Sequence, residues 1–329
     1  MGDALDRAAL FAGLGEAALG DLRALARPFA VAADAQLFRQ GNAPSGLFVV
    51  ETGLLEIATR MPGDEAAWVS RIAPGDVVGE FALLDDGPRS ATVRAVEDTA
   101  GLLIPARGFA AMLGEGHAGP VAAIDRLRGL VATRTRETLK RLSEASVAEA
   151  SELRQAPPWV EPASHRLNAE LLRSLGALTQ LDDGDCDKLI ASSEGLAAPR
   201  NTALVAAGSA PDSVCLVVRG AVRAAFERGA RREQVAIHGP GEWAGLVALI
   251  DRHEQPLALD AAEDSILLRV PAGVFAGWRE HPGRIGQAIL AAVDRQLVRD
   301  QRRANRHLGR AIALGRFNQA GQNTSKGAA

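Results

Sequence analysis

The chain of 329 residues has few cysteines, few aromatic residues and no long apolar run. Its two cysteines, Cys186 and Cys215, belong to no Cys-x-x-Cys motif or Cys/His cluster, which argues against a zinc or iron–sulfur site. Free thiols packed as small hydrophobes fit a reducing cytoplasm, where we expect the protein to act. No run of ~18 apolar residues occurs, and Asp3 and Asp6 interrupt the start, so we expect neither a membrane span nor a signal peptide.

Charge and histidine placement exclude further classes. The formal net charge is -3, so the chain as a whole is not built to bind a polyanion. Lysine occurs only at Lys140, Lys188 and Lys326, and tyrosine does not occur. The histidines are scattered: His117, His165, His238, His253, His281 and His307. None belongs to a nucleophile or metal-ligand pattern, so we expect no enzyme activity and no metal.

The most informative stretch runs from Gly79 to Val93. Gly79 permits close backbone approach, and the small Ala82 lies where helical N–H groups lack partners and bind anions. Arg89 brings a guanidinium fork that matches phosphate oxygens. Glu80 is a carboxylate beside this anion site, where sugar hydroxyls would be suitable donors. The pattern therefore indicates a ligand with a phosphate at one edge and a hydroxyl at the other.

The stretch resembles the phosphate-binding cassette of cyclic nucleotide-binding domains. The likeness rests on Gly79-Glu80-Phe81-Ala82-Leu83-Leu84, a three-residue gap, and Pro88-Arg89-Ser90-Ala91-Thr92. The resemblance implies that Glu80 accepts from the ribose 2′-hydroxyl and that Arg89 pairs with the cyclic phosphate. It also implies that the N–H groups of Ala82 and Ser90, with the Ser90 hydroxyl, complete the anion site. The implied ligand-binding residues are Gly79, Glu80, Phe81, Ala82, Arg89, Ser90, Ala91 and Thr92.

Short strand-like runs separated by glycine-rich turns follow from residue 30 to residue 104, after a predicted helix from Asp3 to Ala26. This pattern favours a closed β-roll. The apolar spacing then predicts a short helix over residues 105–113 and a long helix from Pro120 to about Arg154. The apolar stripe of the long helix packs either on its own domain or on a partner helix.

The second half of the sequence repeats the first. Residues 37–53 match residues 204–220 at an offset of 167, and Pro74-Gly75-Asp76 matches Pro240-Gly241-Glu242 at an offset of 166. The predicted fold is therefore mainly β with helices: two tandem β-rolls of the double-stranded β-helix or jelly-roll type, each followed by a long C-terminal helix. The predicted limits are a first domain 1–154, a Pro-rich linker 155–168, a second domain 169–316 and a disordered tail 317–329.

The second copy of the cassette has lost its charged residues. Leu246 replaces Glu80, Gln255 replaces Arg89, and Pro256, which has no N–H, replaces a donor. We expect this degenerate roll not to bind a cyclic nucleotide. Its apolar run from Gly245 to Ile250 indicates packing or a protein contact instead.

Two further features concern partners. Trp159 in the linker either packs between domains or stacks on the purine of the first site. The last helix carries a basic face in residues 295–316: Arg295, Arg299, Arg302, Arg303, Arg306, Arg310 and Arg316. This face is either a solvated surface or a docking surface for an acidic partner, nucleic acid or an anionic membrane.

We therefore expect a receptor for a cyclic nucleotide, with cyclic AMP favoured over cyclic GMP, that signals to an effector protein through the second domain or the basic helix. A homodimer through the long helices follows only from the resemblance. The alternatives are a transcriptional regulator using the basic helix and a scaffold that binds no nucleotide. We expect no helix-turn-helix after the second long helix and no kinase-inhibitory segment before the first roll, which makes nucleic-acid binding and kinase inhibition disfavoured.

Overall fold

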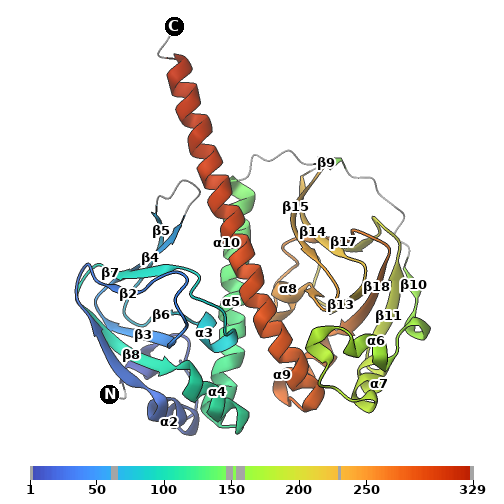
Figure 1. Cartoon of the computed structure of the whole chain (residues 1–329), viewed down its shortest axis with the longest axis horizontal. Helices are drawn as coiled ribbons and strands as arrows, with labels where there is room; N and C mark the ends of the chain where they lie inside the picture. Colours follow the sequence, from blue (N-terminus) through green and yellow to red (C-terminus); the bar gives the residue numbers. More distant parts are fainter. Residues whose placement is uncertain (1–2, 61–65, 146–150, 153–159, 229–230, 327–329) are drawn as a thin grey trace. The chain divides into compact units, whose positions relative to one another are not determined.

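The computed structural model describes residues 3–60, 66–145, 151–152, 160–228 and 231–326 (Figure 1). The chain separates into two compact units, Met1–Leu130 and Val131–Ala329. The division lies inside the first long helix, whereas the sequence placed the end of the first domain at residue 154. The difference arises because the C-terminal part of that helix packs on the second roll, as described below.

The first unit opens with two short helices, α1 (Asp3–Arg7) and α2 (Glu16–Leu25), instead of the single helix that was predicted. Gly13 lies between them at φ 74°, in the left-handed region that interrupts a right-handed helix. Leu5, Phe11 and Leu22 are nevertheless fully buried, so this segment still contributes to the core of the first unit.

Two four-stranded antiparallel sheets form the first roll. The strand order in one sheet is β1-β8-β3-β6, and in the other β2-β7-β4-β5. The strands are β1 (Arg27–Val31), β2 (Gln36–Phe38), β3 (Gly46–Thr52), β4 (Leu55–Arg60), β5 (Ala66–Ile72), β6 (Val77–Val78), β7 (Thr92–Ala95) and β8 (Thr99–Pro105). The helix α3 (Phe81–Leu84) interrupts the roll between β6 and β7, and α4 (Ala106–Gly114) follows β8.

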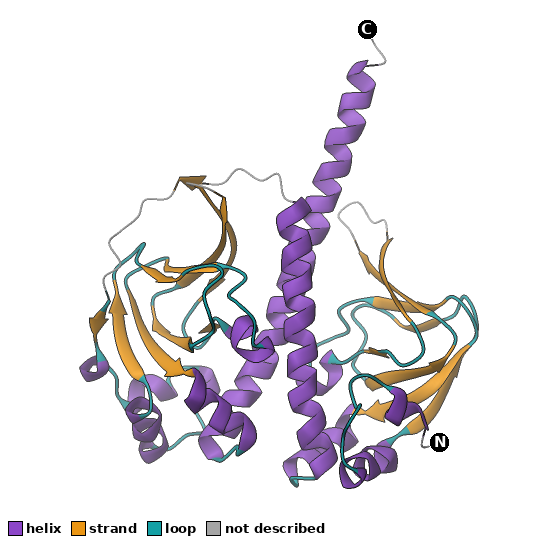
Figure 2. Cartoon of the chain, turned by 180° about the vertical axis from the view of Figure 1, so that it is seen from behind, coloured by secondary structure: helices purple, strands orange, loops and turns teal. Residues whose placement is uncertain are grey.

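The second roll repeats this order with one extra strand at the edge of each sheet. Its sheets run β10-β11-β18-β13-β16 and β12-β17-β14-β15-β9. The strands are β9 (Ser151–Glu152), β10 (Glu161–Pro162), β11 (Glu194–Ala198), β12 (Ala203–Val205), β13 (Ser213–Arg219), β14 (Val222–Arg228), β15 (Arg231–His238), β16 (Trp243–Ala244), β17 (Ala258–Ala261) and β18 (Ser265–Pro271). In each roll, the short helices gather at one end of the strands (Figure 2). The prediction of tandem β-rolls is confirmed.

The helical segments of the second unit lie before, within and after its roll. They are η1 (Ser164–Arg166), α6 (Ala169–Arg173), η2 (Gly176–Leu178), α7 (Asp183–Ala191), α8 (Leu246–Asp251), α9 (Ala272–Glu280) and α10 (Arg284–Lys326). Side chains cap two of these helices: Asn168 accepts from the Leu171 N–H and Asp182 from the Asp185 N–H, both at 2.8 Å.

Two equivalent turns show why the repeat preserves its glycines. Gly53 and Gly220 have φ values of 87° and 80°, which disfavour any residue with a Cβ atom. A Cβ at Gly53 would meet the Asp98 carbonyl oxygen at 2.5 Å, and one at Gly220 would meet the Asp264 carbonyl oxygen at the same distance. In each turn the glycine thus allows the backbone to pass directly over a neighbouring segment of the same chain.

The long helix α5 (Ala118–Ala145) contributes to the core of the second unit. Leu139 and Leu142 join one buried cluster with roll residues such as Val217 and with Leu308 of α10. The apolar stripe whose partner the sequence left open therefore packs, in this part, on the second roll. Burying a leucine side chain contributes about 1.5–3 kcal/mol, so these contacts hold the helix end firmly.

The predicted limits of the linker and tail differ from the structure. The first long helix was expected to reach about residue 154, yet α5 ends at Ala145 and residues 151–152 form β9, which pairs with β15. Of the expected linker 155–168, residues 160–168 contain β10, η1 and part of the α6 cap; residues 155–159, including Trp159, lie outside the described residues. Helix α10 continues to Lys326, ten residues beyond its predicted end, because no proline interrupts the segment.

Candidate functional site

The site begins at the turn between β6 and α3. Gly79 has φ 84°, and its carbonyl oxygen accepts the Ala82 N–H at 3.0 Å. The Glu80 carbonyl oxygen likewise accepts the Leu83 N–H at 3.0 Å. The Ala82 N–H that the sequence assigned to a phosphate thus bonds within the turn in this structure.

Arg89 lies against this turn and is buried, with 6% of its surface exposed. Its Nη1 donates to the Gly79 carbonyl oxygen at 3.1 Å, and its Nη2 donates to Ser45 Oγ and to the Gly46 carbonyl oxygen, each at 2.9 Å. The guanidinium carbon also lies 4.1 Å from the centre of the Phe38 ring, within cation–π range. These contacts fix the orientation of the guanidinium group.

The three oxygen atoms that accept from the Arg89 guanidinium are all neutral, and its Nε has no hydrogen-bond partner among the described residues. Burial lowers the pKa of Arg89 to about 10, although the nearby Glu80 carboxylate acts in the opposite direction. Burying a cation costs several kcal/mol unless it is compensated. An anion that contacts this guanidinium would therefore be strongly favoured.

Glu80 precedes α3 and is buried to a similar degree, at 7% exposure. A buried carboxylate close to a buried guanidinium gives the site one acceptor for hydroxyl groups and one cation for an anion. This separation of roles is the chemistry that a ribose and a phosphate on one ligand require.

The other predicted residues lead from Arg89 into β7. The loop is held to a neighbouring turn, because the Arg89 N–H donates to the Asn42 carbonyl oxygen and the Gly41 N–H donates to the Arg89 carbonyl oxygen, both at 2.9 Å. Thr92 Oγ1 accepts the Gln40 N–H at 3.0 Å. The structure therefore brings both halves of the cassette, Gly79–Ala82 and Arg89–Thr92, to one place.

Sequence reasoning missed the residues that position Arg89. Ser45, Gly46 and Phe38 lie more than forty residues earlier in the chain, at the ends of β2 and β3. The only local signal is Gly46 itself, with φ 154°, where a Cβ would lie 2.1 Å from the Ile104 carbonyl oxygen. A glycine directly before a buried apolar strand indicates close backbone approach but does not identify its partner.

The second roll keeps the backbone of the cassette and changes its chemistry. Gly245 has φ 98°, and Gln255 repeats the loop contacts of Arg89: the Gly208 N–H donates to its carbonyl oxygen, and its own N–H donates to the Ser209 carbonyl oxygen, both at 2.9 Å. Leu246, in the place of Glu80, is 2% exposed, and Gln255 is 5% exposed. A neutral amide and a leucine thus occupy the positions of the cation and the carboxylate.

The basic face of α10 is partly engaged within the second unit. Arg299 forms an ion pair with Glu242 at 3.5 Å, and Arg303 with Asp300 at 3.6 Å. Arg295, Arg306 and Arg310 are exposed. The basic surface available to a partner is therefore smaller than the sequence implied.

Within the described residues, no cluster of three or more His, Cys, Asp or Glu side chains is arranged to hold a metal ion. No helix among them is long and apolar enough to span a membrane. Both cysteines are buried free thiols.

The chain belongs to the cyclic nucleotide-binding domain family. Residues 28–115 and residues 196–280 each match that family, so the match covers both rolls. The resemblance inferred from the first cassette is thereby confirmed for the fold of each half, including the half whose charged cassette residues are replaced.

Individual relatives cover only parts of the chain. The cyclic AMP receptor protein of Thermus thermophilus is 32% identical over 114 residues, which are 35% of this chain and 51% of that protein. The acetyltransferase Pat of Mycolicibacterium smegmatis is 37% identical over 100 residues, 30% of each protein. The chain therefore spans about half or less of the length of these relatives.

Among solved structures, the regulatory domain of Toxoplasma gondii PKA, crystallised with cAMP, is similar over 88% of this chain and 93% of that chain, with 20% identity and a TM-score of 0.33. At this level the likeness carries no argument about ligand or partner.

Proposed function

We propose that the protein is a cyclic nucleotide receptor that binds one ligand in its first roll and none in its second. Arg89 pairs with the cyclic phosphate, Glu80 accepts from the ribose 2′-hydroxyl, and the N–H groups of Ala82 and Ser90 complete the anion site. The N–H of Ala82 then exchanges its bond to the Gly79 carbonyl oxygen for one to the phosphate. The remaining cassette residues, Phe81, Ala91 and Thr92, form the walls of the site.

The burial of Arg89 among neutral acceptors is the observation that carries this proposal. A phosphate adds a negative charge to the one that Glu80 already places near the guanidinium, and it replaces neutral acceptors with charged ones. Charge-assisted hydrogen bonds of this kind are about twice as strong as neutral ones. The replacement of Arg89 by Gln255 in the second roll removes that driving force and explains a single site per chain.

We assign cyclic AMP as the preferred ligand over cyclic GMP. The first cassette lies in the part of the chain that the family match covers, and the curated relative from Thermus thermophilus is described as a cyclic AMP receptor protein. Ser90 suits either nucleotide, because its hydroxyl also donates to a guanine base in the syn conformation. The preference therefore needs a direct comparison of the two ligands.

The output of the receptor is a change in packing that passes along α5. Arg136 and Leu139 anchor the C-terminal part of this helix to the second roll. Nucleotide binding shifts the equilibrium only to the extent that it prefers one arrangement of the helix. The second roll and the basic helix in residues 295–316 present the surface for an effector protein, and the chain acts as a receptor in the cytoplasm rather than as an enzyme.

A transcriptional regulator is the second candidate, because Arg295, Arg306 and Arg310 expose positive charge on one long helix. Measuring DNA affinity against salt concentration with and without cyclic AMP separates the two: a receptor for a protein partner shows no nucleotide-dependent affinity for DNA.

Exchanging Arg89 for glutamine, the residue of the second roll, tests the proposal directly. We expect cyclic AMP affinity to fall by about 2–5 kcal/mol, since one partner of a buried charge pair is removed. Arg107, which is exposed on α4, provides the matched control as Arg107→Gln. Calorimetric affinity within two-fold of the unmodified protein for Arg89→Gln, in a folded sample, would exclude this site.

A further inference from the structure

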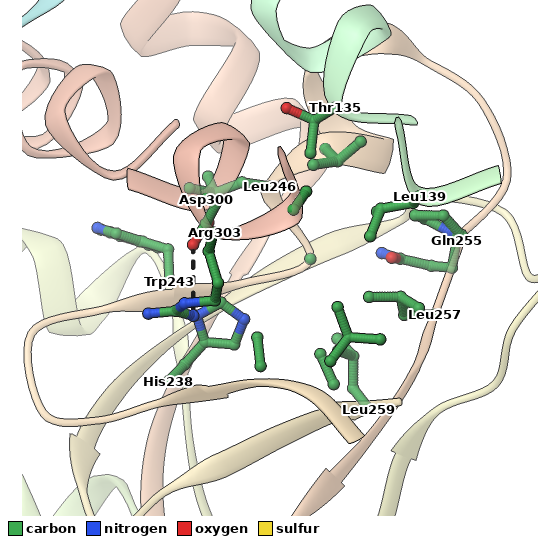
Figure 3. A pocket seen from close by; sticks show the side chains of 17 residues that line it. Thr135, Leu139, His238, Trp243, Leu246, Gln255, Leu257, Leu259, Asp300 and Arg303 are labelled. Atoms are coloured by element: carbon green, nitrogen blue, oxygen red, sulfur yellow. Dashed lines mark ion pairs between the residues drawn. The ribbon is translucent and has the colours of Figure 1, made fainter. Parts of the chain in front are cut away.

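The second roll has a pocket, partly open to solvent, at the position where the first roll has its proposed nucleotide site. The cavity measures ≈ 60 Å³ and is walled by the α8 cassette, by β14, β15 and β17, and by the helices α5 and α10 (Figure 3). Its apolar lining includes Leu139, Leu246, Leu257, Leu259 and Ala304. A water molecule needs about 10–15 Å³ of such space, so the enclosed part of the pocket holds a small molecule. Because the pocket is partly open to solvent, a single ring can project beyond the enclosed part.

The polar side chains of the lining gather at one end. Asp300 and Arg303 of α10 lie beside His238 of β15 (Figure 3). Asp300 and Arg303 form an ion pair at 3.6 Å, and Gln296 Nε2 lies 3.3 Å from both Asp300 Oδ2 and His238 Nδ1. Because the negative charge of Asp300 and the positive charge of Arg303 compensate each other, this end of the pocket does not select a charged ligand.

Gln255 lies at the other end of the cavity, beside Leu139 and Leu257 (Figure 3). It is 5% exposed, and its backbone groups bond to Gly208 and Ser209. Its side-chain amide has no hydrogen-bond partner among the described residues. A ligand with one hydrogen-bonding group would give this amide a partner, and a hydrogen bond of this kind contributes about 0.5–1.5 kcal/mol.

We propose that the second roll binds a small uncharged molecule, with an apolar body and one hydroxyl or carbonyl group that pairs with Gln255. The apolar body contacts Leu246, Leu257 and Leu259. Thr135 and Leu139 of α5 and Ala304 of α10 also line the cavity, so the occupant touches both long helices at once. The degenerate cassette is on this view a receptor site of altered specificity.

Phenol is a suitable probe because it combines a single ring with one hydroxyl group. We expect ligand-observed NMR to show millimolar or tighter binding of phenol to the full chain, and weaker binding of benzene. Saturating cyclic AMP should not displace phenol, since the two ligands occupy different rolls. Phenol binding does not depend on Arg89 or Glu80. Failure of the nucleotide site in the first roll can therefore be told apart from failure of the small-molecule site in the second roll.

Two variants locate the probe. Gln255→Leu keeps the size of the side chain and removes its amide, so phenol affinity should fall about five- to ten-fold, the equivalent of one hydrogen bond, while benzene affinity stays the same. Ala304→Leu should fill the cavity and abolish binding of both probes, with its fold verified by circular dichroism.

Hydrogen exchange gives a second readout that does not require a variant. Phenol should increase protection of amides in residues 131–145 of α5, because the ligand contacts Thr135 and Leu139. No detectable phenol binding to the unmodified chain, or binding that both variants leave unchanged, would overturn the proposal.

Discussion

Replacing Arg136 with methionine should loosen the attachment of α5 to the second roll. Arg136 donates from Nε and Nη2 to the two carboxylate oxygens of Asp251, at 2.5 and 2.8 Å. Its Nη1 donates to the Glu254 carbonyl oxygen at 2.7 Å. The Asp251 side chain is only 2% exposed, so the replacement leaves a buried carboxylate without its cation.

The size of the effect follows from this geometry. Removing one partner of a buried ion pair typically costs about 3–5 kcal/mol. The Arg136 side chain is 24% exposed, and the His253 N–H still donates to Asp251 Oδ1 at 3.2 Å. Both facts reduce the penalty, and we expect a loss of about 2–3 kcal/mol in the unfolding free energy of the second unit. Methionine is as good a helix former as arginine, so helix propensity adds little.

Urea unfolding followed by tryptophan fluorescence measures this loss, because Trp243 and Trp278 lie in the second unit. Arg141→Met is the matched control: Arg141 is exposed on the same helix, and its replacement should cost under about 0.5 kcal/mol. Combining Arg136→Met with Asp251→Asn should cost less than the sum of the single variants. An Arg136→Met protein as stable as the control would refute the reasoning.

Three further outcomes are expected. Gly79→Ala should weaken cyclic AMP binding, measured by calorimetry, more than the control Gly41→Ala does. Both glycines have positive φ, but only at Gly79 would a Cβ lie 2.5 Å from Arg89 Nη1. Equal losses of affinity in the two variants would contradict this steric argument. Cyclic AMP affinity should stay constant from about pH 7 to about pH 9 and fall as the pH approaches the pKa of Arg89, about 10, because only the protonated guanidinium attracts the phosphate. An affinity that falls as the pH is lowered from about 9 to about 7 would contradict this dependence. Burial raises the pKa of both Cys186 and Cys215, the latter to about 12, so a colourimetric thiol reagent at about pH 8 should label neither residue until the protein is denatured.

The repeat made the tandem rolls predictable from the sequence. Equivalent glycines such as Gly53 and Gly220 mark backbone conformations that few other residues adopt, so their constant offset in the sequence indicates a second roll. The first cassette could be predicted for a different reason: Gly79, Glu80 and Arg89 lie close together in the chain, so the pattern is visible in one short stretch.

The partner of the α5 stripe could not be predicted, because periodicity identifies the buried face of a helix and not what covers it. Leu139 and Leu142 pack with β-strand and α10 residues of the second unit, far along the chain. The linker could not be assigned from its sequence either. Pro162 favoured an irregular segment, yet a proline is compatible with an edge strand. In the structure Pro162 lies in β10, opposite Leu196 of β11.

The contacts of Arg89 were beyond sequence reasoning for a similar cause. Ser45 and Gly46 are separated from Arg89 by 44 and 43 positions. Nothing in their local sequence specifies a guanidinium partner, because only the closed roll brings the ends of β2 and β3 to the cassette. The sequence therefore predicted that the two halves of the cassette come together, whereas the groups that orient Arg89 could not be predicted.

Isothermal titration of the nucleotide-free full chain with cyclic AMP and, separately, with cyclic GMP tests the central claim most directly. The account predicts one site per chain, tighter for cyclic AMP, with the heat lost in Arg89→Gln and retained in Gln255→Leu. Binding of two nucleotides per chain would show that the second roll is also a nucleotide site. No heat with either nucleotide would contradict the assignment of the first roll as a receptor.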